Sequence, residues 1–379
     1  MKKKLLRLTT SDISLDSLIK GQLHFMSQFY EVVGVSNNTG KLEAVAQRER
    51  VRTVEIPMHR EIAPLADLKC LWLLYRLFLR ERPYILHANT PKGSLLAMIA
   101  GMFARVPHRI YTVTGLRYQG ARGMLRKVLM TMERLTCLCA NKVIPEGAGV
   151  KKALEADHIT HKPLKIVLNG NINGIDTAFF VPKGTRAERR TALNLAETDF
   201  AFIFIGRIVA DKGMNELATC MRRLESTHPH CKLILVGNFE TDLDPLSDDN
   251  EQFFKTAPNI RFVGFQNDVR PYLEAADALV FPSYREGFPN VVMQAGAMSL
   301  PAIVTDINGC NEIIVESRNG RIIPPRDADA LHKMMQFFVD NPREIQKMAT
   351  QAREMICTRY EQHDVWQALL REYRMLEQV

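Results

Sequence analysis

The chain has 379 residues, of which 46% are hydrophobic and 24% charged, a balance typical of soluble globular proteins. At roughly 150 residues per domain, this length predicts two domains. No apolar run reaches the ~20 residues of a membrane span, and the lysine-rich N-terminus lacks the apolar stretch of a secretory signal, so we expect a cytoplasmic protein. The seven cysteines form no CxxC pair, which favours reduced core thiols over disulfides or a metal site.

The charge is unevenly distributed along the chain. Residues 1–180 carry 27 Lys and Arg against 14 Asp and Glu, a net charge of +13, whereas the remainder carries 23 against 28, a net charge of −5. A basic first half predicts an anionic partner, which is a membrane surface, nucleic acid or a phosphorylated substrate. Nucleic acid is the least favoured, because interleaved aromatic residues and a known binding module are both missing.

Short apolar runs alternate with helical patterns through the first half. Strands are predicted at Leu5–Leu8, Glu31–Val35, Thr53–Ile56, Ile85–His87, Arg109–Val113, Lys142–Ile144 and Lys165–Leu168. Helices are predicted between several of them, for example at Leu65–Arg80, Ser94–Ala104 and Arg122–Leu138. This alternation indicates βαβ units and a parallel sheet.

The second half repeats the same rhythm. Its predicted strands are Phe200–Ile205, Lys232–Val236, Ile260–Val263, Ala278–Phe281, Ala302–Thr305 and Arg321–Ile323. We therefore predict an α/β protein of two facing, doubly wound Rossmann-like domains, residues 1–180 and 185–359, linked through Ala178–Thr185. A helix at about 360–379 is expected to pack back on the first domain. Ligands of such sheets bind beyond the carboxyl ends of the strands, which would place the site in an interdomain cleft.

The first motif is FIGRIVADKG, which runs from the end of an apolar strand into a helix. Gly206 permits close approach to the backbone, and Arg207 and Lys212 place two cations at the end of the sheet. These groups suit a diphosphate whose charge rises as a sugar departs. An ordinary strand-to-helix turn with solvated charges is the alternative.

The second motif is FPSYREGFPNVVMQAGAMSLPAIVTD. A strand ends before the loop Glu286–Pro289, and Pro289 fits the first position of the helix that follows. The N–H groups at such a helix start can hold a phosphate. Glu286 would face the same place, where its carboxylate can bind sugar hydroxyls.

GRIVADKG, PSYREGFPNVVMQA, PAIVTDINGCNEII and NGRIIPPRDADAL together resemble the C-terminal donor domain of glycosyltransferase family 4. VLNGNINGID is similar to the interdomain segment of that family, and the N-terminal domain resembles it more loosely. The resemblance implies the two-domain GT-B fold and retaining transfer of a sugar from a nucleotide diphosphate donor.

The resemblance also implies roles for individual residues. Arg207 and Lys212 match the diphosphate-binding pair, and Glu286 matches the first Glu of the Glu-x7-Glu motif, which contacts the donor sugar. The second Glu of that motif, which binds the ribose, is Gln294 here, and an amide can still accept and donate hydrogen bonds. The remaining donor-binding positions implied by the match are Gly206, Gly287, Phe288, Pro289, Asn290 and Val291.

Acceptor-side candidates lie at two strand ends in the first half. HANTPKG contains His87 and Lys92, and Lys92 lies beside a proline that can begin a helix, so this segment can hold an acceptor phosphate. A packed turn is the alternative. TVTGLRY places Thr114 before Gly115, where many family members carry a histidine. No metal is expected. Asp327-Ala-Asp329 resembles a DxD metal motif, but Asp327 is better interpreted as a helix N-cap, and Asp242-Leu-Asp244 is predicted to lie in a polar loop.

The basic stretch from Arg117 to Arg134 separates cations from apolar residues. Arg122, Arg126 and Lys127 lie apart from an apolar set, namely Leu125, Val128, Leu129 and Met132. This pattern fits an interfacial helix on anionic lipid, at the inner face of the cytoplasmic membrane. The alternative is a helix whose apolar face packs in the core.

The sequence thus predicts transfer of a hexose or N-acetylhexosamine, from a UDP-sugar in our interpretation, to a glycan or polyprenyl-diphosphate-linked saccharide. No carboxylate is placed as an enzymatic nucleophile, so the leaving diphosphate would guide the acceptor hydroxyl. Two other classes remain open: a nucleotide-sugar 2-epimerase of the same architecture and a non-catalytic two-lobed sugar-binding protein. No cofactor or metal is expected in addition to the donor.

Overall fold

The structure is a computed structural model that describes residues 2–59, 63–240 and 244–378. The chain forms two compact units, one made of Met1–Gly174 with Gln362–Val379 and the other of Ile175–Glu361. The segment Ala178–Thr185 belongs to the second unit, where the backbone N–H groups of Lys183 and Thr185 donate to Glu274 Oε1 at 2.8 and 3.0 Å.

The first unit contains a parallel sheet with the strand order β3-β2-β1-β4-β5-β6. The strands are β1 (Lys4–Ser11), β2 (Glu31–Asn37), β3 (Arg52–Glu55), β4 (Ile85–Ala88), β5 (His108–Val113) and β6 (Lys142–Pro145). The order reverses between β1 and β4, which defines a doubly wound sheet. The predicted strand Lys165–Leu168 is wrong. Only Leu164 forms a bridge, with Val143, and Leu168 has a φ of 50°, which an extended strand does not adopt.

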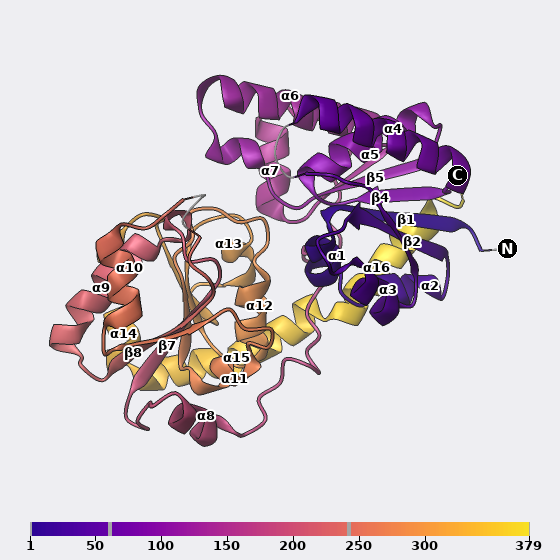
Figure 1. Cartoon of the computed structure of the whole chain (residues 1–379). Helices are drawn as coiled ribbons and strands as arrows, with labels where there is room; N and C mark the ends of the chain where they lie inside the picture. The colour runs from indigo at the N-terminus through magenta and orange to yellow at the C-terminus, as the bar shows by residue number, and fades with distance from the viewer. Residues whose placement is uncertain (1, 60–62, 241–243, 379) are drawn as a thin grey trace. The chain divides into compact units, whose positions relative to one another are not determined.

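Helices cover both faces of this sheet (Figure 1). They are α1 (Asp12–Leu18), α2 (Gln22–Ser27), α3 (Leu42–Glu49), α4 (Pro64–Glu81), α5 (Pro91–Phe103), α6 (Gly123–Cys139), α7 (Ala148–Ala156) and α16 (Gln362–Met375), with a short 3-10 helix at Arg117–Gly120. Side chains alternate along β1, so Leu6 and Leu8 pack with α4–α7 whereas Leu5 packs with α1–α3 and α16. Because the sheet is buried on both faces, its strands are nearly continuous apolar runs.

The second unit repeats the topology with the strand order β12-β11-β10-β7-β8-β9. The strands are β7 (Phe200–Ile205), β8 (Cys231–Val236), β9 (Ile260–Gly264), β10 (Ala278–Phe281), β11 (Ala302–Thr305) and β12 (Gly320–Ile323). The helices are α8 (Arg186–Ala192), α9 (Met214–Thr227), α10 (Asp248–Thr256), α11 (Arg270–Ala275), α12 (Asn290–Ala297), α13 (Cys310–Ile313), α14 (Ala328–Asp340) and α15 (Pro342–Tyr360), with a 3-10 turn at Ala210–Lys212. The predicted pair of doubly wound α/β domains is confirmed.

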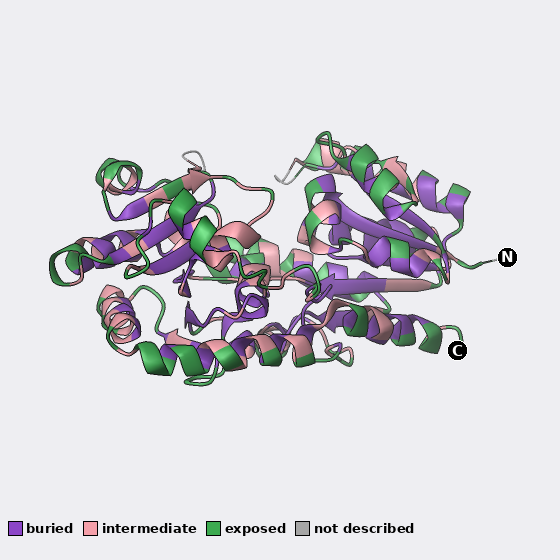
Figure 2. Cartoon of the chain, turned by 90° about the horizontal axis from the view of Figure 1, so that it is seen from below, coloured by how far each residue is buried: buried purple, intermediate pink, exposed green. Residues whose placement is uncertain are grey.

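The strands of both units are largely buried, and the outer faces of the helices are exposed (Figure 2). All seven cysteines are free, and only Cys357 is not fully buried, as the core-thiol interpretation predicts. In the described parts of the chain, no helix combines the length and apolarity needed to cross a bilayer.

Candidate functional site

Three loops meet at the carboxyl end of the second sheet, after β7, β10 and β11. The loop after β7 reaches the loop after β10 at Gly213, where an added Cβ would lie 2.1 Å from the carbonyl oxygen of Pro282. The loop after β11 reaches it at Gly309, where a Cβ would lie 2.5 Å from the carbonyl oxygen of Gly287. Both glycines have φ values near +72°, in the left-handed region. These glycines therefore allow the two motifs of the sequence to share one site.

The closest charged contact in this loop cluster joins the two motifs. Lys212 Nζ forms an ion pair with the Glu286 carboxylate, although the residues are 74 positions apart. Ser283 Oγ donates to Glu286 Oε1 at 3.0 Å, and the Lys212 and Glu286 side chains are only 13% and 19% exposed. Partial burial makes this pair stronger than a surface ion pair and makes loss of either member costly.

The same two charges influence a buried thiol beneath the loops. Burial raises the pKa of Cys310 well above its usual range, the Glu286 carboxylate raises it further and the Lys212 ammonium lowers it. Cys310 is therefore a neutral packing residue at the start of α13, not a nucleophile.

Arg207 lies apart from this pair. Its guanidinium is exposed and donates to Glu240 Oε2 at 2.9 Å. The preceding Gly206 continues the sheet through its N–H, which donates to the carbonyl of Val236 at 3.0 Å. The two cations predicted to act together thus have separate carboxylate partners, Glu240 and Glu286. Sequence patterns did not identify Glu240 or Ser283, because neither has a distinctive spacing.

The helix after the second motif begins one residue later than predicted. Pro289 is the N-cap with extended backbone, and Asn290 is the first residue of α12. Phe288 is buried, and its ring centroid lies 5.6 Å from that of Tyr360, which fixes the loop before the helix. Gln294 lies one turn beyond Asn290 on the same face and is half-buried. The start of α12 therefore points its first-turn N–H groups, including that of Val291, toward the loop cluster.

Further polar contacts hold the loops in place. The Tyr284 N–H donates to the Asp211 carbonyl at 2.9 Å, and its hydroxyl donates to both oxygens of Glu216 at 2.7 Å. Asp327 caps α14 by accepting from the Ala330 N–H at 2.8 Å, which confirms the N-cap interpretation.

In the first unit, His87 is a core residue. It is fully buried on β4, with Nδ1 2.5 Å from the Tyr373 hydroxyl and Nε2 2.7 Å from the Thr112 hydroxyl. Burial, with a contribution from Arg7, lowers its pKa well below the usual range, so the ring is neutral. With both nitrogens engaged, His87 has the packing role that the sequence left as an alternative, and we remove it from the acceptor-side candidates.

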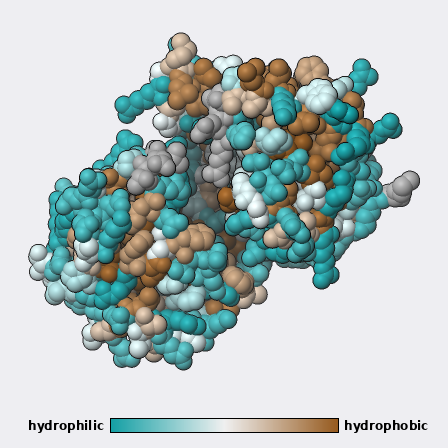
Figure 3. Space-filling model, viewed as in Figure 1, coloured by the Kyte–Doolittle hydropathy of each residue, from teal (hydrophilic) through white to brown (hydrophobic). Residues whose placement is uncertain are grey.

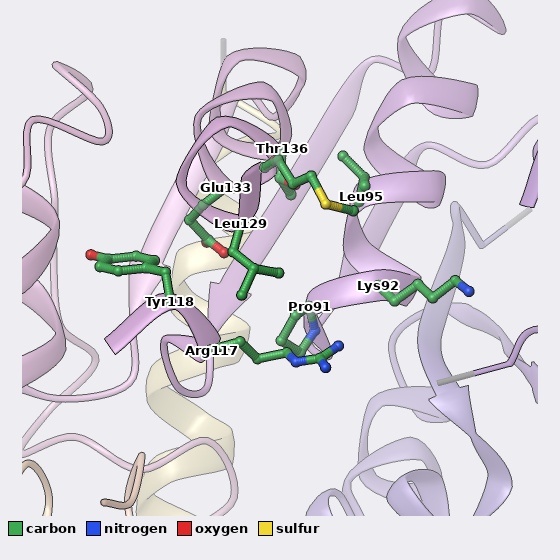
Figure 4. A pocket seen from close by; sticks show the side chains of 9 residues that line it. Pro91, Lys92, Leu95, Arg117, Tyr118, Leu129, Glu133 and Thr136 are labelled. Carbon is green, nitrogen blue, oxygen red and sulfur yellow. The ribbon is translucent and has the colours of Figure 1, made fainter. Parts of the chain in front are cut away.

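Lys92 is nearly buried at the start of α5 and forms an ion pair with Asp67 at 2.6 Å. It lines a small pocket of the first unit, whose other walls include Arg117, Tyr118 and Glu133. Figure 4 shows the Lys92 side chain extending away from Glu133. Arg117, which the sequence motifs did not single out as an acceptor residue, is the exposed cation at this pocket.

Thr114 and Gly115 follow β5. The Thr114 hydroxyl donates to the Asn89 carbonyl at 2.8 Å, which ties the ends of β4 and β5 together. Both residues are half-buried. They therefore lie at the carboxyl end of the first sheet, as predicted, and Thr114 has a structural contact there.

The basic helix α6 has little of its surface in the core. Leu125 and Val128 are 53% and 43% exposed, whereas Leu129 and Met132 line the pocket described above. Arg126 pairs with Asp157 at 3.1 Å. The outcome for the apolar face of α6 is divided: Leu129 packs against the core, as the alternative holds, whereas Leu125 and Val128 are exposed.

Comparisons with known proteins agree with this architecture. Two doubly wound parallel units define the GT-B class, and the fold is similar to that of HepE from Anabaena, solved in complex with UDP (TM-score 0.82, 16% identity, 99% of this chain and 100% of that chain). It is also similar to sucrose-phosphate synthase from Thermosynechococcus elongatus (TM-score 0.80, 18% identity, 99% of each chain). At these identities the likeness establishes the fold.

Sequence comparisons identify the family. Residues 185–355 match the family described as glycosyl transferases group 1, and residues 24–170 match the glycosyl transferase 4-like domain. The chain is 28% identical to the capsular polysaccharide biosynthesis glycosyltransferase CapM of Staphylococcus aureus, over 97% of this chain and 96% of that protein. It is 27% identical to a UDP-Gal:α-D-GlcNAc-diphosphoundecaprenol α-1,3-galactosyltransferase of Escherichia coli, over 74% and 73%. The chain is a GT-B glycosyltransferase of the family 4 type.

Proposed function

We propose that the enzyme transfers a hexose or N-acetylhexosamine from a UDP-sugar to a lipid-linked or glycan acceptor in bacterial polysaccharide synthesis, with retention of anomeric configuration. The observation that carries the donor half of this proposal is the half-buried Lys212–Glu286 pair at the meeting point of three loops. A cation and a carboxylate side by side match the two parts of a nucleotide sugar, its diphosphate and its hydroxyls. The named activity of the Escherichia coli relative, and the structures of HepE with UDP and UDP-glucose, support the choice of UDP.

In this mechanism the diphosphate takes Lys212 as a counter-ion when the donor binds. Glu286 then accepts hydrogen bonds from sugar hydroxyls, and the hydrogen bond from Ser283 keeps its carboxylate in place. Arg207 leaves its exposed partner Glu240 at little cost, because surface ion pairs contribute about 0–1 kcal/mol. The first turn of α12, with Gly287–Val291 before and within it, supplies N–H groups for phosphate or sugar oxygens, and Gln294 accepts from the ribose.

The chemical step exchanges one bond for another at the anomeric carbon. The acceptor oxygen forms a bond to that carbon on the face from which the diphosphate leaves, and the carbon–oxygen bond to the diphosphate breaks. The acceptor proton passes to a leaving phosphate oxygen. Lys212 and Arg207 stabilise the charge that develops there, so the proposal needs no metal and no enzymatic nucleophile.

Turnover with a panel of UDP-, GDP- and ADP-sugars tests the donor. The Glu286→Gln variant should bind UDP normally and lose at least about a hundredfold in transfer, since it loses a charge-assisted contact made to the reacting sugar. Glu344→Gln, an exposed carboxylate paired with Lys347, is the matched control and should keep full activity. Near-normal turnover by Glu286→Gln at saturating donor would contradict the assignment.

Two further tests address the other parts of the proposal. Activity should survive exhaustive chelation with EDTA, and a dependence on re-added Mn²⁺ or Mg²⁺ would show that a metal takes part. Gln294→Glu should keep activity, because the carboxylate accepts the same ribose hydrogen bonds.

We also propose that the first unit associates with the inner face of the cytoplasmic membrane, where a polyprenyl-diphosphate-linked acceptor would lie. The net charge of +13 on residues 1–180 and the exposed basic helix α6 support it. Arg122→Glu with Lys127→Glu avoids Arg126, which pairs with Asp157, and should weaken flotation with anionic liposomes at low salt. A wild-type protein that ignores such liposomes would indicate a soluble acceptor.

A further inference from the structure

The helix α4 has two apolar faces, and only one of them packs in the core. Its buried side chains include Leu74, Leu77 and Phe78. A second stripe, at the helical spacing of three and four residues, faces solvent: Leu65 is 87% exposed, Leu68 66%, Trp72 54% and Leu79 48%. The apolar stripe of a surface helix ordinarily faces the core, whereas these four side chains remain exposed in the described chain.

The exposed stripe continues onto the end of α5. Met102 is 40% exposed and Phe103 66%. An open apolar groove lies between the two helices, lined by Leu68, Leu71, Trp72, Tyr75, Ala100 and Phe103. Figure 3 shows apolar side chains gathered over this part of the first unit. We define the α4–α5 ridge as Leu65, Leu68, Trp72, Leu79, Met102 and Phe103. Scattered exposed apolar residues are ordinary, but a contiguous ridge with a groove indicates an interaction surface.

The segment that carries this ridge is rich in positive charge. Residues 64–139, which span α4 to α6, contain twelve Lys and Arg but only three acidic residues, Asp67, Glu81 and Glu133. Asp67 pairs with Lys92 at 2.6 Å, and Glu81 pairs with Lys4 at 2.9 Å. Glu133 is buried and accepts from the Tyr111 hydroxyl at 2.7 Å. No acidic side chain in this range is exposed, so the exposed charges that α4 to α6 contribute are cationic.

Cations also lie on the ridge itself. The Arg76 guanidinium carbon is 4.8 Å from the centroid of the Trp72 ring, one turn away on α4. Lys69 and Arg80 are exposed on the same helix. A tryptophan stacked with an arginine at the border of an apolar stripe is suited to the boundary between lipid headgroups and acyl chains.

We propose that the α4–α5 ridge is a membrane-insertion surface that buries its apolar side chains among the acyl chains of an anionic bilayer. This inference deepens the membrane association proposed above, and it assigns the hydrophobic part of that association to α4 and α5 instead of α6. The charge complementarity favours an anionic bilayer over a second copy of this chain, because two copies would bring their cationic borders together. Burial of apolar surface is not screened by salt, so binding persists in part where electrostatic attraction has faded.

The chain carries a reporter for this proposal, since Trp72 is one of only two tryptophans. The full-length protein is mixed with vesicles of one part phosphatidylglycerol to two parts phosphatidylcholine, and tryptophan emission and co-flotation are recorded at low and high salt. Emission should shift to shorter wavelength and be quenched by brominated acyl chains in the wild type. Both changes should be lost in Trp72→Phe, because Trp366 is half-buried, packs beside Phe25 and donates from its Nε1 to Asn173 at 2.7 Å.

A second variant, Leu65→Ser with Leu68→Ser and Leu79→Ser, removes the three exposed leucines of the ridge without touching the packed face of α4. Vesicle partitioning should fall by at least about tenfold, since each exposed leucine contributes apolar burial. Phe265→Ser, which alters an equally exposed apolar residue (62%) of the second unit, is the control and should bind vesicles as the wild type does. Unchanged partitioning of the triple variant, or Trp72 emission that ignores bound vesicles, overturns the proposal.

Three measurements separate this proposal from the proposed donor activity and from dimerisation through the ridge. The triple variant should keep the wild-type affinity for UDP by calorimetry, so loss of vesicle binding cannot be attributed to loss of the donor site. A wild-type enzyme that turns over no nucleotide sugar would refute the proposed function while leaving the vesicle result intact. A wild-type dimer that becomes monomeric in the triple variant, with vesicle binding unaffected, would show that the ridge pairs two copies and would overturn the insertion surface.

Discussion

The half-buried pair of Lys212 and Glu286 gives the most direct test of the donor site. Replacing Lys212 by Met keeps the length and apolar stem of the side chain and removes only the charge. In the free enzyme the Glu286 carboxylate then loses its ion pair and keeps the hydrogen bond from the Ser283 hydroxyl at 3.0 Å. In the complex it also removes the proposed counter-ion of the diphosphate.

The expected magnitude has two parts. A hydrogen bond to a charged group contributes about 1.5–3 kcal/mol, so Lys212→Met should weaken UDP binding by about tenfold to 150-fold. The unpaired Glu286 carboxylate then adds repulsion: at an effective dielectric near 20, two like charges about 8 Å apart repel by roughly 2 kcal/mol. Glu286→Gln removes this second part. The double variant should therefore bind UDP more tightly than Lys212→Met alone.

Calorimetric titration of UDP into the wild type, both single variants and the double variant completes the cycle. Urea denaturation of the same four proteins shows whether the fold is retained. Lys347→Met, which removes an exposed lysine paired with Glu344 at 2.7 Å, is the control and should leave UDP affinity unchanged. UDP binding by Lys212→Met within about twofold of the wild type would refute the counter-ion role. Strictly additive losses in the double variant would refute the repulsion argument.

Three other predictions concern residues outside the Lys212–Glu286 pair. Glu240→Gln frees Arg207 from a partly exposed pair, so UDP affinity by calorimetry should rise by up to about fivefold, and a fall would contradict the proposed release of Arg207. Gly309→Ala places a Cβ 2.5 Å from the Gly287 carbonyl and should lower stability and raise the donor KM in steady-state kinetics, whereas Gly184→Ala, with a similar φ but open surroundings, should lose stability only. Burial raises the pKa of Glu133 to about 7 despite the hydrogen bond from Tyr111. The folded-state pKa of Glu133 lies above its unfolded value of 4.5, so its carboxyl group must lose a proton in the buried site as the pH rises. The free energy of unfolding of the wild type therefore falls by up to about 3 kcal/mol between pH 4.5 and 7 and is unaffected below that window. Glu133→Gln should therefore gain stability relative to the wild type in urea denaturation at pH 8 but not at pH 4, and an equal difference at both values would exclude this origin.

Local patterns in the sequence determined most of the fold. Parallel strands buried on both faces must be nearly continuous apolar runs, and twelve of the thirteen predicted strands are present for that reason. Lys165–Leu168 has a similar composition, but the positive φ of Leu168 and the single bridge at Leu164 keep it out of the sheet. Composition alone does not encode such a backbone conformation. The motifs around Arg207 and Glu286 indicated the family, because several spacings had to match together.

Only the tertiary structure decided which residues act on one another. Lys212 and Glu286 are 74 positions apart, and their pairing depends on two glycines that let three loops come together. The sequence made His87 an acceptor-side candidate. Its place on β4, between Tyr373 and Thr112, makes it a core residue instead. The exposure of Leu65, Leu68 and Trp72 is likewise invisible in the sequence, since an apolar stripe on a helix looks the same whether or not another element covers it. The sequence determined which chemistry is present, and long-range packing determined where that chemistry is accessible.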